Sequence, residues 1–188
     1  MIYKTIRNQV FIRGLFLISI ISVNASFAQT YILEKGTVTF FSSAPLEDIK
    51  ATNNNTRSVF DSDKGDIVFS IPIKEFQFKK SLMQEHFNEK YLESDKFPKS
   101  SFSGKVSGFT KGTANGNVWA EGTLEIHGVK NQVKIPGTLN FSGDQVHIEC
   151  KFVVKLEDYK IKIPSLLFQN IAEEVEVSLN YDYKLYEK

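Results

Sequence analysis

This sequence lacks the residues on which several classes of protein depend. It has one cysteine in 188 residues, which excludes an internal disulfide framework and a zinc site built from cysteines. Its 23 basic residues balance 22 acidic ones, so the chain has no charge excess of the kind that favours nucleic acid. No apolar run reaches the roughly 20 residues that a membrane-spanning helix needs. The composition is therefore typical of a single globular domain.

The residues that commonly carry chemistry are also few. His127 and His147 fall on the polar faces of predicted strands and His86 on a predicted helix, so no two of them have the spacing of a shared metal site. The chain has no G-x-S-x-G motif for a serine nucleophile. Cys150 alternates with apolar residues, which indicates an inert buried thiol. We expect no metal, no cofactor, no nucleic-acid partner and no enzymatic activity.

The first 28 residues have the order of a secretory signal peptide. A basic start precedes a short apolar run at residues 15–21, and the small residues Ser26 and Ala28 precede Gln29. The apolar run is too short to cross a bilayer. We therefore expect cleavage after Ala28, one mature domain over residues 29–188, and a periplasmic or secreted protein.

Apolar and polar residues alternate with a period of two along most of the remaining chain, which predicts β-strands. The clearest pair covers residues 117–139 and turns at Gly128. Trp119 lies opposite the apolar face there, so either this tryptophan is exposed or the two faces are reversed. The other expected strands cover residues 31–41, 46–52, 56–61, 68–73, 99–109, 146–155 and 175–183.

Residues 81–92 are the one segment with clear helical spacing, because their apolar side chains recur three and four positions apart. We expect Ser81 to cap this helix with Gln84 as its partner, and Pro98 to prevent any continuation. A second, short helical or irregular piece is expected at residues 164–170.

About eight antiparallel strands with one apolar face each must form two packed sheets or a closed barrel. A lipocalin-type barrel leaves room for a small ligand, whereas a sandwich fills its interior with its own side chains. The 16 phenylalanines suit either arrangement. In an open barrel the expected lining residues are Phe40, Phe69, Phe76, Phe78, Phe87, Phe102, Leu124, Ile126 and Phe152, and Met83 and Phe87 place the helix as a lid. In a closed one the same side chains form an ordinary core.

Selection of a ligand head group needs a few polar side chains at the mouth of such a barrel. Our hypothetical mouth set comes from the helix and from a late loop: His86, Asn88, Tyr91, Asp158 and Tyr159. The alternative for His86 is that it merely packs at the barrel end.

Four segments, in order, resemble the YceI-like family. Residues 82–98, which end in Lys96-Phe97-Pro98, and residues 101–104 resemble its helix and the strand that follows it. Residues 122–129, Gly-Thr-Leu-Glu-Ile-His-Gly-Val, match its hairpin motif, and residues 156–161 and 171–177 resemble its two closing segments. The resemblance covers nearly all of the chain after residue 28.

This resemblance implies an all-β fold, an eight-stranded antiparallel lipocalin-like β-barrel with one short helix capping an end. It also implies an envelope protein that binds a long-chain isoprenoid or similar lipid in its lumen as a carrier, store or sequestering protein. Two alternatives stay open: an envelope protein-interaction module with a filled core, and an enzyme that acts on a bound lipid with His86 as base. The edges of an imperfectly closed barrel would also allow a homodimer.

Overall fold

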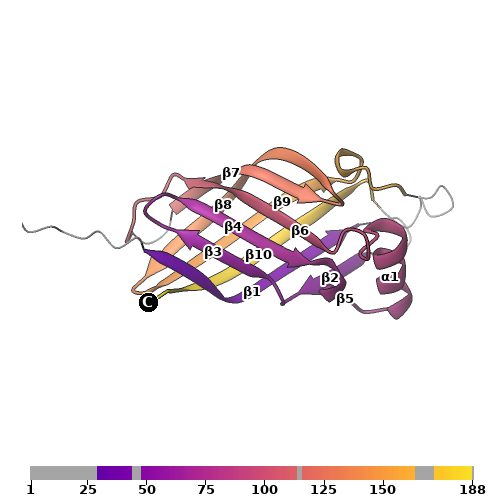
Figure 1. Ribbon diagram of the computed structural model, residues 1–188, viewed down its shortest axis with the longest axis horizontal. Helices are drawn as coiled ribbons and strands as arrows, with labels where there is room; N and C mark the ends of the chain where they lie inside the picture. The colour runs from indigo at the N-terminus through magenta and orange to yellow at the C-terminus, as the bar shows by residue number, and fades with distance from the viewer. Residues whose placement is uncertain (1–28, 44–47, 114–115, 164–171, 188) are drawn as a thin grey trace, which may run out of the picture.

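The sheet of this protein closes on itself to form a barrel, with the helical segments gathered at one end (Figure 1). The computed structural model describes residues 29–43, 48–113, 116–163 and 172–187. Its strands are β1 (Thr30–Ser42), β2 (Ile49–Asn53), β3 (Arg57–Asp61), β4 (Asp66–Pro72), β5 (Gln77–Phe78), β6 (Lys99–Ser107), β7 (Gly116–Ile126), β8 (Val129–Ser142), β9 (Gln145–Lys155) and β10 (Glu174–Leu185). The predicted signal peptide and the predicted piece at residues 164–170 lie outside the described residues.

Antiparallel neighbours follow one another around the ring, and β10 pairs with β1 to close it. β2 and β3 act as one interrupted strand, because both hold the same register against β1, with Val38 opposite Asn53 and Tyr31 opposite Phe60. β4 and β5 pair with β3 and β2 in turn. The ring is thus the predicted eight-stranded antiparallel barrel. The pairing of β10 with β1 closes the sheet except at the two-residue strand β5, and the expected homodimer stays a prediction.

Asn53 explains the interruption between β2 and β3. Its side chain is fully buried, and its Nδ2 donates to the carbonyl oxygen of Pro72 at 2.7 Å. Its Oδ1 accepts from the backbone N–H of Asn55 at 2.8 Å, which turns the chain. One buried amide therefore breaks β2–β3 and holds the end of β4 beside the break.

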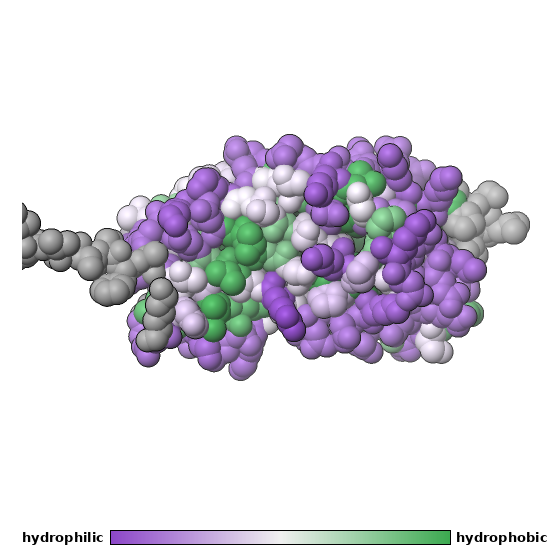
Figure 2. Space-filling model, in the orientation of Figure 1, coloured by the Kyte–Doolittle hydropathy of each residue, from purple (hydrophilic) through white to green (hydrophobic). Residues whose placement is uncertain are grey.

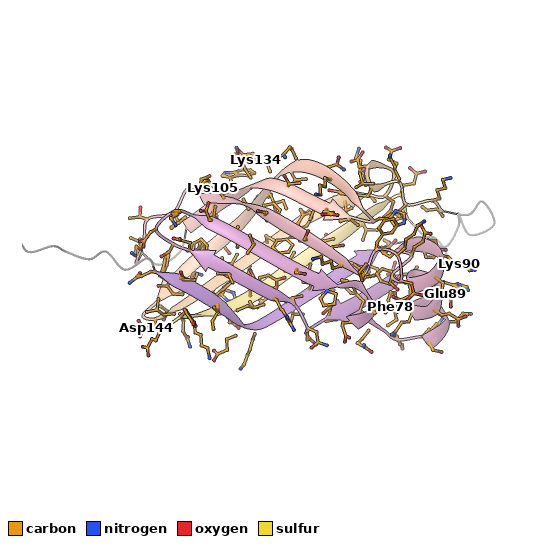
Figure 3. All side chains as sticks on the ribbon, viewed as in Figure 1. Phe78, Glu89, Lys90, Lys105, Lys134 and Asp144 are labelled. Carbon is orange, nitrogen blue, oxygen red and sulfur yellow. The ribbon has the colours of Figure 1, made fainter. Side chains whose placement is uncertain are left out.

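The predicted inward and outward faces of β7 are confirmed. Val118 and Leu124 are buried, while Trp119 is 44% exposed with the Lys134 ammonium 5.2 Å from its ring centroid. Charged side chains project outward (Figure 3), and Lys105 pairs with Asp66 on the neighbouring strand at 2.6 Å. Most of the visible outer surface is hydrophilic, with a hydrophobic area over β3 and β4 (Figure 2), where Val59 and Val68 are exposed.

A two-residue turn joins β7 to β8. His127 and Gly128 both have positive φ, 52° and 72°, as a tight hairpin turn with the twist of the flanking strands requires. The predicted turn at Gly128 is confirmed, but the placement of His127 on the polar face of a strand is wrong. β7 ends at Ile126, and the imidazole is folded back against the protein with its side chain 11% exposed.

The predicted helix is present in two geometries. α1 (Ser81–His86) continues directly into η2 (Phe87–Tyr91), a π-helical turn. The expected Ser81 cap is wrong, because the extended Lys80 takes the N-cap position and makes no side-chain capping bond. The remaining short helices are the 3₁₀ turns η1 (Ile73–Glu75) and η3 (Glu157–Tyr159). No helix among the described residues is long and apolar enough to cross a membrane.

Candidate functional site

The barrel has an apolar cavity at the end that carries α1. Its volume is about 540 Å³, within the range of about 300–1,000 Å³ typical of small-molecule sites. Side chains of β1, β2, β4, β5, β6, β7, β9 and β10 line it, and the α1–η2 segment contributes others. The rest come from η1, from the residue after it and from the residues that flank η3. Its lining residues are Val38, Phe40, Ser42, Ile49, Phe69, Ile71, Ile73, Phe76, Phe78, Lys80, Leu82, Met83, His86, Phe87, Tyr91, Leu92, Ser100, Leu124, Ile126, Phe152, Val154, Leu156, Ile161, Val175, Val177 and Leu179.

Eleven of the thirteen side chains predicted to bind a ligand line this cavity: Phe40, Phe69, Phe76, Phe78, Met83, His86, Phe87, Tyr91, Leu124, Ile126 and Phe152. Phe102 is only 2% exposed and lies deeper, beside a second, smaller void. Tyr159 is buried away from the cavity in η3. Their roles as ligand contacts stay predictions.

Sequence reasoning missed most of the aliphatic lining. Val175, Val177 and Leu179 alternate along β10 and all point inward, as Val38 does on β1. Alternation identified their faces, but it does not say how far along the barrel axis the lumen is open. The excess of aromatic residues in the composition pointed to the phenylalanines, whereas the aliphatic lining residues carry no such compositional signal.

Four phenylalanine rings join the helical segment to the barrel rim. Phe87 of η2 stacks on Phe40 of β1 with the ring centroids 5.3 Å apart. Phe78 lies 5.0 Å from Phe87, and Phe76 lies 5.5 Å from both Phe40 and Phe87. The labelled Phe78 lies at the helix end of the barrel, near Glu89 and Lys90 (Figure 3). These ring contacts attach the apolar face of α1 and η2, which together we call the lid, to the barrel.

The lid itself is thinly packed. α1 contains no buried residue, and Leu82 is 59% exposed although it lines the cavity. In η2 the N–H of Leu92 donates to the carbonyl of Phe87 at 2.9 Å, which is the wider π-type bond. A ligand that entered the cavity here would cover side chains such as Leu82, which now contact both the cavity and water.

The polar groups at the cavity differ from the predicted mouth set. His86 and Tyr91 lie there, and burial raises the pKa of the Tyr91 hydroxyl. Asn88 instead donates from its side chain to the carbonyl oxygen of Gln84 at 2.9 Å. Asp158 belongs to η3, where its carbonyl accepts from Asn131 at 2.8 Å. The polar lining of the cavity therefore has His86 and Tyr91 from the prediction, with Lys80, Ser42 and Ser100 added.

Tyr159 takes part in a different structure, a cluster of hydrogen bonds around His127 that we call the His127 knot. His127 Nε2 lies 2.9 Å from a Glu93 carboxylate oxygen, and its Nδ1 lies 3.2 Å from the carbonyl oxygen of Tyr159. Both partners are acceptors, so only the doubly protonated ring donates to both. The hydrogen bond from His127, with help from Lys96, lowers the pKa of Glu93.

Backbone strain gathers at the same knot. Three non-glycine residues among those described have positive φ: Glu93 at 42°, His127 at 52° and Lys160 at 56°. Glu93 and His127 are the pair joined by the 2.9 Å contact, and Lys160 follows Tyr159 directly in the chain. Such conformations persist only where surrounding contacts impose them. The knot ties the segment after η2 to the β7–β8 turn and to η3, at the cavity end of the barrel.

The described residues contain no group of three or more His, Cys, Asp or Glu side chains that could hold a metal ion. His147 pairs with Asp182 at 2.6 Å and with Glu149 at 3.2 Å on the outer surface. Cys150 faces the small void, where burial raises the pKa of its thiol to about 12. The geometry thus offers an apolar container with few polar groups at its mouth.

Comparison with known proteins gives this container a family. The chain matches the model of the YceI-like domain over residues 19–183, and no curated protein matches it. A polyisoprenoid binding domain from Saccharophagus degradans aligns with a TM-score of 0.72 at 14% identity, covering 83% of this chain and 98% of that one. BcnA from Burkholderia cenocepacia aligns at 0.66 and 16% identity, covering 78% and 95%. The Campylobacter jejuni YCEI protein aligns at 0.55 and 10% identity, covering 97% and 100%. At these identities the solved structures share the fold, and the match along the sequence shows that the chain belongs to the YceI-like family.

Proposed function

We propose that this protein binds an apolar lipid of isoprenoid type in the cavity beneath α1, as a carrier, store or sequestering protein of the cell envelope. The observation that carries the proposal is the 540 Å³ cavity, whose wall is almost wholly aliphatic and aromatic. Removing apolar surface from water is the main driving force available in such a site. The relative from Saccharophagus degradans is described as a polyisoprenoid binding domain, which supports this choice of ligand class.

Binding needs no catalytic group. The YceI-like family is a family of binding domains, and no charged side chain among the described residues pairs with His86 to make it a base. The filled-core alternative, with function on the outer surface, fits only the half of the barrel away from α1. We therefore propose a lipid-binding protein without enzymatic activity.

Export is the second part of the proposal. The backbone N–H of Gln29 donates to a carboxylate oxygen of Asp63 at 2.9 Å. Cleavage after Ala28 would turn that amide into a charged α-ammonium group beside the same carboxylate. N-terminal sequencing of the protein from its native source tests this: a chain that begins at Gln29 and occurs outside the cytoplasm supports export, and an intact N-terminus contradicts it.

Native mass spectrometry of the protein purified from its own source, followed by organic extraction and lipid mass spectrometry, tests the ligand. We expect one apolar molecule per barrel. In Phe87→Asp a charge replaces a ring of the cavity wall, so the lipid should be lost. The matched control is Val153→Asp, which places the same charge at a 56% exposed position on β9. An empty protein that also takes up no added polyprenyl alcohol would contradict the proposal.

A further inference from the structure

A wall of three side chains divides the lumen. Phe69, Phe152 and Leu179 line the main cavity on one side and a second void of about 40 Å³ on the other. Phe69 comes from β4 and Phe152 from β9, which are on opposite walls of the barrel (Figure 1). The wall therefore reaches across the lumen from both sides.

An aromatic stack supports this wall from behind. Phe69 stacks on Phe102 of the neighbouring β6 with the centroids 5.2 Å apart and the planes 16° from parallel. The Tyr181 ring of β10 meets Phe69 edge-on at 6.3 Å, a contact across the barrel. Phe102 and Tyr181 are each only 2% exposed, so protein atoms surround both rings except at the small void.

The hydrocarbon tail of a ligand cannot reach the space behind the wall unless the three side chains move apart. The void has less than a tenth of the volume of the main cavity, about 40 Å³ against about 540 Å³. Beyond it, Tyr181 packs against Tyr183 at 6.0 Å, and Tyr183 against Phe60 at 6.4 Å. A tail that enters beneath α1 must end at Phe69, fold back, or displace a close-packed stack.

We propose that the wall of Phe69, Phe152 and Leu179 is a chain-length stop, which restricts this protein to isoprenoid tails of a few units. The inference rests on the proposed function and specifies its ligand. Each methylene that enters the cavity adds apolar burial, while each one beyond the stop adds none and must be accommodated elsewhere. Affinity should rise with tail length up to the stop and fall for tails that are too long to fit in front of it.

Native mass spectrometry with geraniol, farnesol, geranylgeraniol and solanesol, each at the same concentration, measures this profile. In the unaltered protein occupancy should rise from geraniol to farnesol and fall at solanesol. Phe69→Ala joins the two spaces, so affinity for geranylgeraniol should rise about tenfold relative to farnesol. Val68→Ala, at the neighbouring exposed position of β4, is the control and should keep the original profile.

A second variant keeps the test decisive if Phe69→Ala fails to fold. Val175→Phe adds bulk to the main cavity at a position of β10 whose partner on β9 is Val154 and not a residue of the wall, and should move the best-bound alcohol toward geraniol. The melting temperature of each variant shows that the barrel is intact. Strong binding of solanesol to the unaltered protein, or an unchanged profile in a folded Phe69→Ala, overturns the stop while leaving lipid binding in place. Failure of the unaltered protein to bind any of the four alcohols overturns the proposed function as well.

Discussion

The two halves of this barrel have the same alternating strands and opposite interiors. At the α1 end, inward side chains surround a cavity, and Phe40, Phe78 and Phe87 are only half-buried. At the other end, near Asp144 in Figure 3, Phe60 and Tyr183 have no exposed surface. A side chain that points into the barrel is therefore not necessarily part of a packed core. Whether a side chain becomes core or cavity wall depends on what reaches it from across the ring.

The largest expected difference between the halves is the cost of removing a ring. Phe60→Ala should lower the free energy of unfolding by about 3 to 5 kcal/mol, because it leaves a hole in a close-packed stack. Phe87→Ala, in the open half, should cost much less, because this ring is only partly buried and already borders a cavity. Urea unfolding of both variants measures the two costs. Equal losses would contradict the division of the barrel into a filled half and an open half.

A smaller effect should come from a hydrogen bond that is buried in the filled half. The Tyr183 hydroxyl lies 2.7 Å from Ser58 Oγ, which itself donates to the carbonyl oxygen of Val68 at 2.7 Å. Tyr183→Phe removes the hydrogen bond between Tyr183 and Ser58 but keeps the one from Ser58 to Val68. The loss in unfolding free energy should therefore be about 1 kcal/mol. A loss as large as that of Phe60→Ala would mean that hydrogen bonding, and not packing, stabilises this half.

The open half should respond to pH, because the His127 knot supports its lid. The pKa of Glu93 is lowered in the folded protein, so this carboxylate stabilises the fold above its ordinary value of 4.5, and the contribution is lost as the pH falls through the lowered pKa. At neutral pH, Glu93→Gln should lower the urea midpoint by less than Tyr183→Phe does. The difference between Glu93→Gln and the unaltered protein should vanish in acid. A difference that persists at the lowest pH would place the effect elsewhere.

The smallest expected effect is chemical and leaves stability unchanged. Burial raises the pKa of Cys150 from 9.0 to about 12, so its thiolate fraction at neutral pH is roughly a thousandfold below that of a free cysteine. Labelling of the native protein with iodoacetamide should therefore be very slow, and unfolding in urea should restore the ordinary rate. Rapid labelling of the folded protein would show that the void beside Cys150 is open to water.

Local sequence patterns predicted the strands of the barrel and their inward faces, but not the contacts that side chains make across its interior. Alternation identified the strands and their inward faces, and three-and-four spacing identified the lid, because both signals are local. The cap at Ser81 and the polar face for His127 were wrong, and Tyr159 does not line the cavity, because distant partners decide all three positions. Lys80 takes the cap position, Glu93 holds His127, and η3 turns Tyr159 into the protein. The depth of the cavity escaped prediction for the same reason, since Phe69 meets Tyr181 across the ring.

The pairing of β1 with β10 has a consequence for how the chain reaches this structure. Tyr31 is opposite Leu185, so nearly the whole chain lies between two residues that must meet. The hairpins β7–β8 and β8–β9 close short turns and can form early, whereas the seam between β1 and β10 has a large loop-closure entropy to overcome. Until that seam forms, β1 and β10 each present an unpaired edge. Folding should therefore be slow in its last step, and a chain truncated before residue 174 should aggregate because the barrel has no strand with which to close.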